Sequence, residues 1–147
     1  MRTVPTVVRA GAAELPQVRD FYATVGYGGG AQPDDHVLVA RGPLGLVAAV
    51  RLCEEEGCLV LRGMSVAAAW RGRGVGSALL GAVDAGIGER ECWCVPYEHL
   101  GPFYSRIGFV AVEEGESPDF LVARAEGYRR RGQAVMLTRR PERRVGD

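Results

Sequence analysis

The chain has 147 residues, 47% of them hydrophobic, and its 18 basic and 18 acidic side chains cancel. This length supports one hydrophobic core, so we expect a single domain over residues 1–147. The balanced charge argues against nucleic acid or a membrane as the partner. Every basic residue is an arginine, which excludes phosphate loops and Schiff-base chemistry that depend on lysine.

The first half of the chain predicts a strand, a helix and an antiparallel meander. Residues 4–9 form a β-prone run, and residues 14–25 repeat apolar side chains at helical spacing. Three further β-prone runs follow at 36–41, 44–54 and 58–66, separated by short glycine-containing turns. Short turns of this kind join antiparallel neighbours, so these runs should belong to one sheet.

The second half predicts helices that alternate with short strands. Its last helix has a clear start, with Ser117 as a hydroxyl cap and Pro118 at the first position. The expected elements are a helix at 74–87, a strand at 91–95, a helix at 100–107, a strand at 109–112, a helix at 118–131, a strand at 134–139 and a frayed, charged tail at 141–147.

The cysteines and the start of the chain bear on the compartment. No hydrophobic signal core opens the sequence, and the longest apolar stretch, at 44–50, is far too short for a membrane span. We therefore expect a cytoplasmic protein with reduced cysteines. Cys92 and Cys94 alternate along a predicted strand, where they could ligate a metal or pack as small hydrophobic side chains. No proper partner pair accompanies them, and we expect no metal.

A glycine-rich loop, Arg71-Gly72-Arg73-Gly74-Val75-Gly76, lies between a predicted strand and a predicted helix. Backbone amides at a helix start lack partners, and the helix dipole favours an anion there. Glycines permit close approach, and the two arginines can add charge-assisted hydrogen bonds. An ordinary glycine-rich turn is the alternative. A dinucleotide site is disfavoured, because Ser77 stands where a third glycine would fall and antiparallel strands precede the loop.

Three short segments occur along the chain in this order: Leu61-Arg62-Gly63-Met64-Ser65-Val66, Arg71-x-x-Gly74-x-Gly76 and Phe103-Tyr104-x-x-x-Gly108-Phe109. Together, in residues and in spacing, they resemble the GNAT superfamily of N-acetyltransferases. The segment at 92–100 resembles a subgroup of that family to which we attach no substrate. The resemblance covers nearly the whole chain and implies a mixed α/β fold, with a mostly antiparallel, twisted sheet of about six to seven strands flanked by helices.

The resemblance assigns the chemistry to the loop, to the strand before it and to a tyrosine. Loop amides would bind the pyrophosphate of the cosubstrate acetyl-CoA, and a bulge at the end of the 58–66 strand would offer amides to the pantetheine and the thioester. Tyr104 matches the position that often protonates the leaving thiol, which suits a phenol with an ordinary pKa of about 10. The alternative for Tyr104 is a packed aromatic beside Phe103. The implied cofactor-binding residues are Met64, Ser65, Val66, Arg71, Gly72, Arg73, Gly74, Val75, Gly76 and Ser77.

The base that would deprotonate the acceptor amine is not assigned. Some members of the family carry a glutamate on the strand before the loop, but Val60 stands at that place here. Tyr97 stands where many relatives have an asparagine that contacts the coenzyme, so that contact is not expected. The remaining base candidates, acting through water, are Glu54, His99, Glu113 and Glu114.

These features predict transfer of an acetyl group from acetyl-CoA to a primary amine of a small molecule or a peptide. The alternative is a non-catalytic acyl-CoA sensor or interaction module, suggested by Val60. Arginines at 129–131 and near the C-terminus fit a helix end and a solvated tail as well as they fit nucleic acid. The helix at 118–131 could wall the acceptor pocket or only pack on the sheet, and a homodimer is conceivable.

Overall fold

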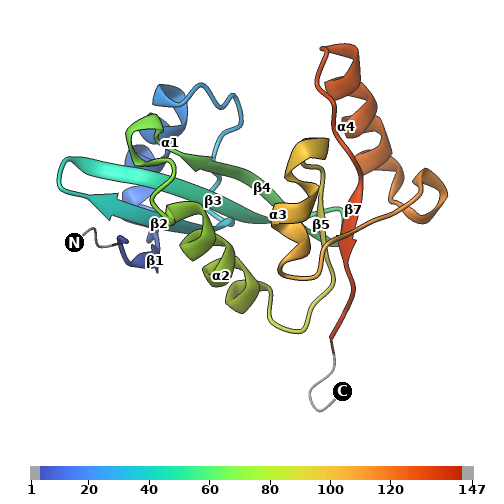
Figure 1. The fold of residues 1–147 in the computed structure, drawn as a ribbon, viewed down its shortest axis with the longest axis horizontal. Helices are drawn as coiled ribbons and strands as arrows, with labels where there is room; N and C mark the ends of the chain where they lie inside the picture. The colour runs from blue at the N-terminus through green and yellow to red at the C-terminus, as the bar shows by residue number, and fades with distance from the viewer. Residues whose placement is uncertain (1–3, 144–147) are drawn as a thin grey trace.

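A computed structural model describes residues 4–143, which form one sheet of seven strands with helices on both faces (Figure 1). The strand order is β1-β2-β3-β4-β5-β7-β6, and of these neighbouring pairs only β4 and β5 are parallel. The strands are β1 (Val7–Arg9), β2 (His36–Gly42), β3 (Gly45–Glu55), β4 (Cys58–Val66), β5 (Cys92–Cys94), β6 (Val110–Ala111) and β7 (Thr138–Arg140). The helices are α1 (Leu15–Thr24), α2 (Val75–Ile87), α3 (Gly101–Ser105) and α4 (Asp119–Arg130). The predicted mixed α/β fold with a mostly antiparallel sheet is confirmed.

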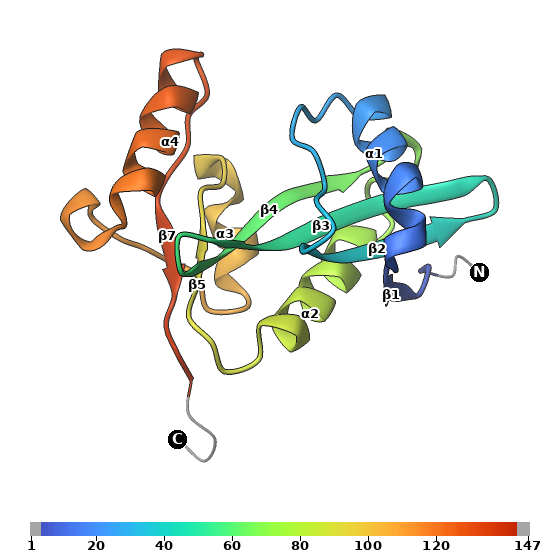
Figure 2. The ribbon, with the colours of Figure 1, turned by 180° about the vertical axis from the view of Figure 1, so that it is seen from behind.

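Helices cover both faces of the sheet because the strand side chains point alternately to its two faces, and both faces carry apolar side chains. In β2, Leu38 and Ala40 pack in the core that contains α2, whereas Val37 and Val39 pack in the core that contains α1. Figure 1 shows α2 and α3 in front of the sheet, and Figure 2 shows α1 in front when the molecule is turned. A strand buried on both faces reads as a continuous apolar run, as β2 does.

The two cysteines of β5 lie on the same face, as predicted. Cys92 and Cys94 pack in the core with α2, while Trp93 between them packs with α4. Burial raises the pKa of Cys92 to about 12 and that of Cys94 well above its ordinary value. Both thiols are therefore packed as small hydrophobic groups. Among residues 4–143, no three His, Cys, Asp or Glu side chains are grouped so that they could hold a metal.

The helix expected over 100–107 is shorter than predicted. A 3-10 turn at Glu98–Leu100 leads into α3, which ends at Ser105. Gly108 then adopts φ +100°, a left-handed conformation that redirects the chain into β6. The predicted break at Gly108 is confirmed, but the helix ends earlier than the local pattern indicates.

The predicted start of the last helix is wrong in two respects: Ser117 is not its cap, and Pro118 stands at the N-cap instead of the first helical position. The hydroxyl of Ser117 does not cap the helix; it donates a 2.9 Å hydrogen bond to the carbonyl oxygen of Glu113. Pro118 occupies the N-cap, and its carbonyl accepts from the amides of the first turn. The helix itself is confirmed as α4, which buries Leu121 and Ala125 against the sheet.

The start of the expected C-terminal tail contacts the body of the protein. Arg143 donates to the carboxylate of Asp84 at 3.0 Å and to the carbonyl oxygen of Ile107 at 2.6 Å. The rest of that expected tail, at 144–147, lies outside the described residues. In the part of the chain described, every helix is too short or too polar to cross a membrane.

Candidate active site

The sheet opens between β4 and β5, and a cavity of about 850 Å³ lies at this opening. The two strands pair through two residue pairs only. Beyond them β4 continues along β3, whereas the chain after β5 turns to the segment that precedes β7, where Tyr97 forms an isolated bridge with Val135. Backbone groups of β4 on the open side therefore have no strand partner and are free to bind a ligand.

A bulge shapes the β4 wall of the cavity. Ala49 pairs with Ser65 and Arg51 with Arg62, so β4 has one residue more than β3 between these pairs. Gly63 in the bulge adopts φ +67°, and a Cβ there would lie 2.9 Å from the hydroxyl of Tyr22. Glycine is thus required by both conformation and space. Met64 and Ser65, two of the predicted site residues, line the cavity just after the bulge.

The glycine-rich loop leaves a run of backbone amides without partners. Within residues 4–143, the amides of residues 72–77 have no backbone or side-chain acceptor, and the first helical hydrogen bond of α2 is from Ala78 to Gly74. Gly72 and Gly74 adopt φ +75° and +83°, which turns the chain tightly into the helix. Unpaired amides at the positive end of a 13-residue helix fit a pyrophosphate.

The loop side chains divide into those that reach the cavity and those that do not. Arg71 lines the cavity, and its Nε donates to the carbonyl oxygen of Val66 at 3.3 Å. Arg73 instead lies over the ring of Trp70, 4.9 Å from its centroid. Of the predicted site residues, the cavity is lined by Met64, Ser65, Arg71 and Tyr104, whereas Val66, Gly72, Arg73, Gly74, Val75, Gly76 and Ser77 lie outside its lining.

Besides Arg73, two residues outside the lining have side chains that already make other contacts. Val75 is buried in the core, so only its amide is available to a ligand. The hydroxyl of Ser77 accepts a 3.1 Å hydrogen bond from Arg106. Gly76 faces α3, since a Cβ there would lie 3.8 Å from the ring of Phe103. This contact places the start of α2 next to the helix that carries Tyr104.

Tyr104 lies at the cavity, and its ring is held on two sides. It is 5% exposed and packs edge-on against Phe103 and Phe109, with ring centroids 5.1 and 6.2 Å apart. Burial raises the pKa of Tyr104 above its ordinary value, and no hydrogen bond from a described residue offsets this. The phenol therefore stays protonated at neutral pH, as a proton donor must. The packed and the functional interpretations of Tyr104 are compatible in this geometry.

The loop after α1 forms a wall that the sequence did not reveal. Residues 25–29 line the cavity, and the side chain of Arg51 in β3 donates a hydrogen bond to this loop. Arg51 is 3% exposed and donates to the hydroxyl of Tyr27 at 2.7 Å, to Asp35 at 2.9 Å and to the carbonyl of Gly30 at 3.0 Å. Burial alone would lower the pKa of Arg51, but the hydrogen bonds with Tyr27 and Asp35 outweigh it and raise the pKa. The anchor is thus permanently charged.

Arginines of β4 and α4 form a third wall that sequence reasoning also missed. Arg62, Arg124 and Arg131 line the cavity together with Tyr128. The first two share Glu55, which accepts from Arg62 at 3.1 Å and from Arg124 at 2.9 and 3.1 Å. The helix predicted at 118–131 therefore walls the cavity as well as packing on the sheet. In the sequence, the one feature that pointed to this wall was the position of Arg62 next to the bulge.

Two of the predicted base candidates lie away from this cavity. Glu54 pairs with Arg90 on the surface at 2.5 Å, and that hydrogen bond holds the pKa of Glu54 below its ordinary value. His99 stacks on Tyr97, with ring centroids 5.7 Å apart, and does not line the cavity. Val60 does line it and is packed with apolar neighbours of α4. No carboxylate among the described residues lines the cavity.

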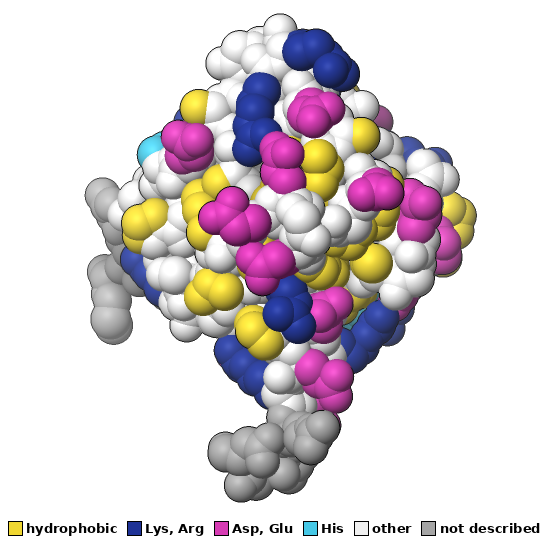
Figure 3. Space-filling model, turned by 90° about the vertical axis from the view of Figure 1, so that its right-hand side faces the viewer, with side chains coloured by type: hydrophobic (Ala, Val, Ile, Leu, Met, Phe, Trp, Pro, Cys, Tyr) yellow, Lys and Arg dark blue, Asp and Glu magenta, His cyan; other side chains and the backbone are white. Residues whose placement is uncertain are grey.

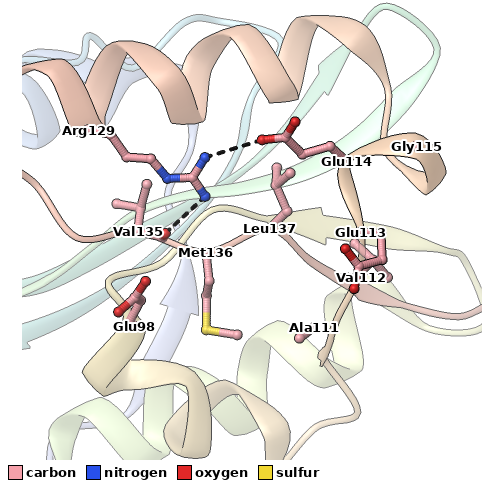
Figure 4. Close-up of a pocket in the computed structure, with 10 residues that line it drawn as sticks. All are labelled: Glu98, Ala111, Val112, Glu113, Glu114, Gly115, Arg129, Val135, Met136 and Leu137. Carbon is pink, nitrogen blue, oxygen red and sulfur yellow. Dashed lines mark hydrogen bonds and ion pairs between the residues drawn. The ribbon is translucent and has the colours of Figure 1, made fainter.

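The other two base candidates face a separate hollow of about 460 Å³ (Figure 4). There Glu114 points to Arg129, at 3.5 Å, and Arg129 also donates to the carbonyl of Val135 at 3.2 Å. Glu113 lies on the same side of this hollow as Glu114. Val135 lines both spaces, but neither glutamate lines the larger one. Sequence reasoning had no means to tell these two surfaces apart.

Comparison with known proteins identifies the family. Residues 33–111 match the family described as the acetyltransferase (GNAT) domain. A search of curated proteins by sequence gives no significant match.

Solved structures of this fold cover almost the whole chain. A histone acetyltransferase HPA2 and related acetyltransferase from Corynebacterium glutamicum is similar at TM-score 0.68 and 18% identity, over 99% of this chain and 100% of that one. N-acetylglutamate synthase from Neisseria gonorrhoeae, complexed with coenzyme A and N-acetyl-glutamate, gives 0.68 and 16% over 98% of this chain, which spans 36% of the synthase. Rv2747 from Mycobacterium tuberculosis, in complex with CoA and NLQ, gives 0.64 and 18% over 92% of this chain and 98% of that one.

The matched region extends over more than half of the chain and contains the bulge, the glycine-rich loop and Tyr104. The chain therefore belongs to the GNAT acetyltransferase family, a family of acyl-CoA-dependent acyltransferases.

Proposed function

We propose that the protein transfers the acetyl group of acetyl-CoA to a primary amine of a small molecule. The observation that carries this proposal is the position of Tyr104, a buried and protonated phenol at the cavity where β4 and β5 separate. The neighbours from Neisseria and Mycobacterium, which are described as complexes with coenzyme A, support a coenzyme A thioester as the donor.

The donor would be held at two places. Its pyrophosphate suits the unpaired amides of residues 72–77, with Arg71 adding charge. Its pantetheine arm suits the open edge of β4 after the bulge, where Met64 and Ser65 line the cavity. Amides of this edge would also stabilise the oxyanion, and losing one such donor costs about 2.7 to 4 kcal/mol in transition-state stabilisation.

The reaction follows from these positions. A neutral amine attacks the thioester carbon, a carbon–nitrogen bond forms, and negative charge develops on the carbonyl oxygen. The carbon–sulfur bond then breaks, and Tyr104 protonates the sulfur, which leaves as a thiol. The nitrogen releases its extra proton to water, because no described carboxylate lines the cavity. Tyr104 recovers a proton from solvent before the next cycle.

The test is release of free coenzyme A that depends on an added amine. Tyr104→Phe should lower kcat by about tenfold or more while leaving coenzyme affinity unchanged, because the ring packing survives and only the proton donor is lost. A chain that binds coenzyme A tightly yet acetylates no amine in a broad screen would be a non-catalytic sensor or interaction module instead, and the proposal would be abandoned.

We further propose the cytoplasm as the site of this reaction. All four cysteines of the described chain are free thiols, as a reducing compartment favours. Localisation of the full chain fused to a fluorescent protein would test this.

A further inference from the structure

The charged side chains that line the larger cavity have a single sign. Among its described lining residues four are arginines, and none is an aspartate or a glutamate. Arg71 belongs to the donor end, because it is part of the glycine-rich loop and donates to Val66. Arg62 comes from β4, Arg124 from α4 and Arg131 from the C-cap of α4; all three lie away from that loop and are left for the acceptor.

These three arginines are only partly neutralised. Glu55 is shared between Arg62 and Arg124, so one carboxylate serves two guanidinium groups. Burial alone would raise the pKa of Glu55, but Arg124 and Arg62 outweigh it and hold the pKa below its ordinary value. Arg131 lies over the ring of Tyr128 at 5.3 Å and has no ion pair among residues 4–143. The cavity wall therefore keeps a net positive charge at neutral pH.

This arrangement contrasts with the outside of the same end of the molecule. Figure 3 shows side chains of both signs, Asp and Glu as well as arginine, among hydrophobic ones over that outer face. The chain as a whole has no net charge. The positive lining is thus a local feature of the cavity and does not reflect a basic protein.

We propose that the acceptor is an amine of amino-acid size that carries a carboxylate, bound by Arg62, Arg124 and Arg131. The inference rests on the acetyl transfer proposed above. Guanidinium groups bind a carboxylate through paired, charge-assisted hydrogen bonds. A diamine would instead bring a second positive charge against the same wall.

The size of the cavity argues for a small molecule. Its volume of about 850 Å³ must hold the pantetheine arm as well as the acceptor. Residues 25–29 close one side and α4 closes another, which leaves room for an amino acid next to the thioester. Tyr27 and Tyr128 add hydroxyl groups to these two walls.

The same charges favour the reactive form of the acceptor. A positive charge close to an ammonium group lowers its pKa, because it disfavours the charged form. The arginines that hold the carboxylate would therefore also help the neighbouring amine to lose its proton. The lowered pKa of the amine would explain how water can accept its proton in a site whose lining has no carboxylate base.

Binding of the acetylated product tests the inference without turnover. Titration calorimetry with the coenzyme A-saturated protein would compare N-acetyl-L-alanine, its carboxamide, N-acetyl-L-glutamate and the cationic N-acetylputrescine. We expect the carboxylates to bind about tenfold or more tightly than the carboxamide, and N-acetylputrescine to bind most weakly. If N-acetyl-L-alanine already binds more tightly than its carboxamide, the recognised group is the α-carboxylate. If only N-acetyl-L-glutamate binds more tightly than the carboxamide, the recognised group is a side-chain carboxylate.

Two arginine variants connect this preference to the residues. Arg131→Gln and Arg124→Gln should each reduce the preference for carboxylate by about tenfold and leave coenzyme A affinity unchanged. Arg130→Gln is the matched control: it makes the same change at the last residue of α4, directly before Arg131, and Arg130 is exposed and does not line the cavity. We expect its preference to equal that of the unmodified chain.

The possible failures are distinct. If the carboxamide or N-acetylputrescine binds as tightly as the carboxylates, or if the preference survives in Arg124→Gln and Arg131→Gln, the inference is overturned and the acetyl transfer is untouched. If the protein releases no coenzyme A with any amine, the proposed function fails, and carboxylate binding alone would then describe a ligand site of a sensor.

Discussion

The guanidinium group of Arg51 donates a 2.7 Å hydrogen bond to the hydroxyl of Tyr27 and so ties the loop after α1 to the middle of β3. The loop lines the cavity on the surface, while the arginine that holds it is buried. Asp35 and the carbonyl of Gly30 accept from the same guanidinium group. One charged side chain thus positions a cavity wall that has no regular secondary structure.

Tyr27→Phe removes one acceptor from this buried charge. We expect the free energy of unfolding to fall by about 1 to 3 kcal/mol, because a hydrogen bond to a charged group is lost and Arg51 already has an unpaired Nε. The KM for the acceptor should rise more than the KM for acetyl-CoA. Urea unfolding and steady-state kinetics would measure both effects.

Tyr22→Phe is the control for that substitution. The hydroxyl of Tyr22 is buried and has no hydrogen-bond partner in the described chain, so its removal should cost less than removal of the Tyr27 hydroxyl. A larger loss of stability in Tyr22→Phe than in Tyr27→Phe would contradict the role given to the contact between Arg51 and Tyr27.

The pH dependence of kcat should reflect the raised pKa of Tyr104. Because burial raises that pKa above its ordinary value of about 10, the phenol keeps its proton over the whole range from pH 6 to pH 10. With a good acceptor, kcat should rise as the bound amine loses its proton and then stay level up to about pH 10. A falling limb between pH 8 and pH 10 that disappears in Tyr104→Phe would show instead that the pKa is ordinary or lowered.

The glycine-rich loop can be tested at Gly74, which adopts φ +83° at the N-cap of α2. Gly74→Ala should strain the backbone by roughly 1 to 2 kcal/mol, since other residues rarely adopt this conformation. The displaced amides should then weaken coenzyme A binding, which calorimetry would measure. Unchanged affinity in a folded Gly74→Ala variant would remove the loop from the proposed pyrophosphate site.

Gly81→Ala provides the matched control within the same helix. Position 81 is exposed, and a Cβ there meets no atom within 4 Å. Alanine in a helix interior is more favourable than glycine by roughly 0.5 to 1 kcal/mol. The variant should therefore unfold at a higher temperature and bind coenzyme A as the unmodified chain does.

The parts of the fold that could be predicted have local causes. Apolar periodicity, together with the glycines between the two segments, predicted a strand at 58–66 and a helix from about residue 74. The structure places β4 and α2 there. The Ser117 cap failed because a capping side chain must choose among nearby acceptors and donors. Its hydroxyl found the carbonyl of Glu113 in the preceding turn instead.

The missed parts of the site depend on contacts distant in sequence. Arg124 meets Glu55 across 69 residues, and Arg51 meets Tyr27 across 24. No local pattern distinguishes an arginine that lines a cavity from one on a solvated surface. The loop, the bulge and Tyr104 could be proposed from the sequence as the site for the donor because they follow family spacing, whereas the arginines proposed for the acceptor needed coordinates.

Reaction of the cysteines with a thiol reagent tests how tightly the core is packed, and it also determines the background of a coenzyme A release assay. Cys53, Cys92 and Cys94 are buried, and burial raises the pKa of Cys53 and of Cys92 to about 12. Cys58 is half-buried. Burial raises its pKa most, and the nearby carboxylates raise it further, Glu91 more than the others.

One thiol per chain should therefore react at pH 8 in the folded protein, more slowly than free cysteine, and all four should react in denaturant. Cys58→Ser should abolish the reaction of the folded chain. If a second thiol of the folded chain reacts at a similar rate, the core between β5 and α2 opens far more readily than its packing indicates, because a buried thiol must reach solvent before it can ionise and react.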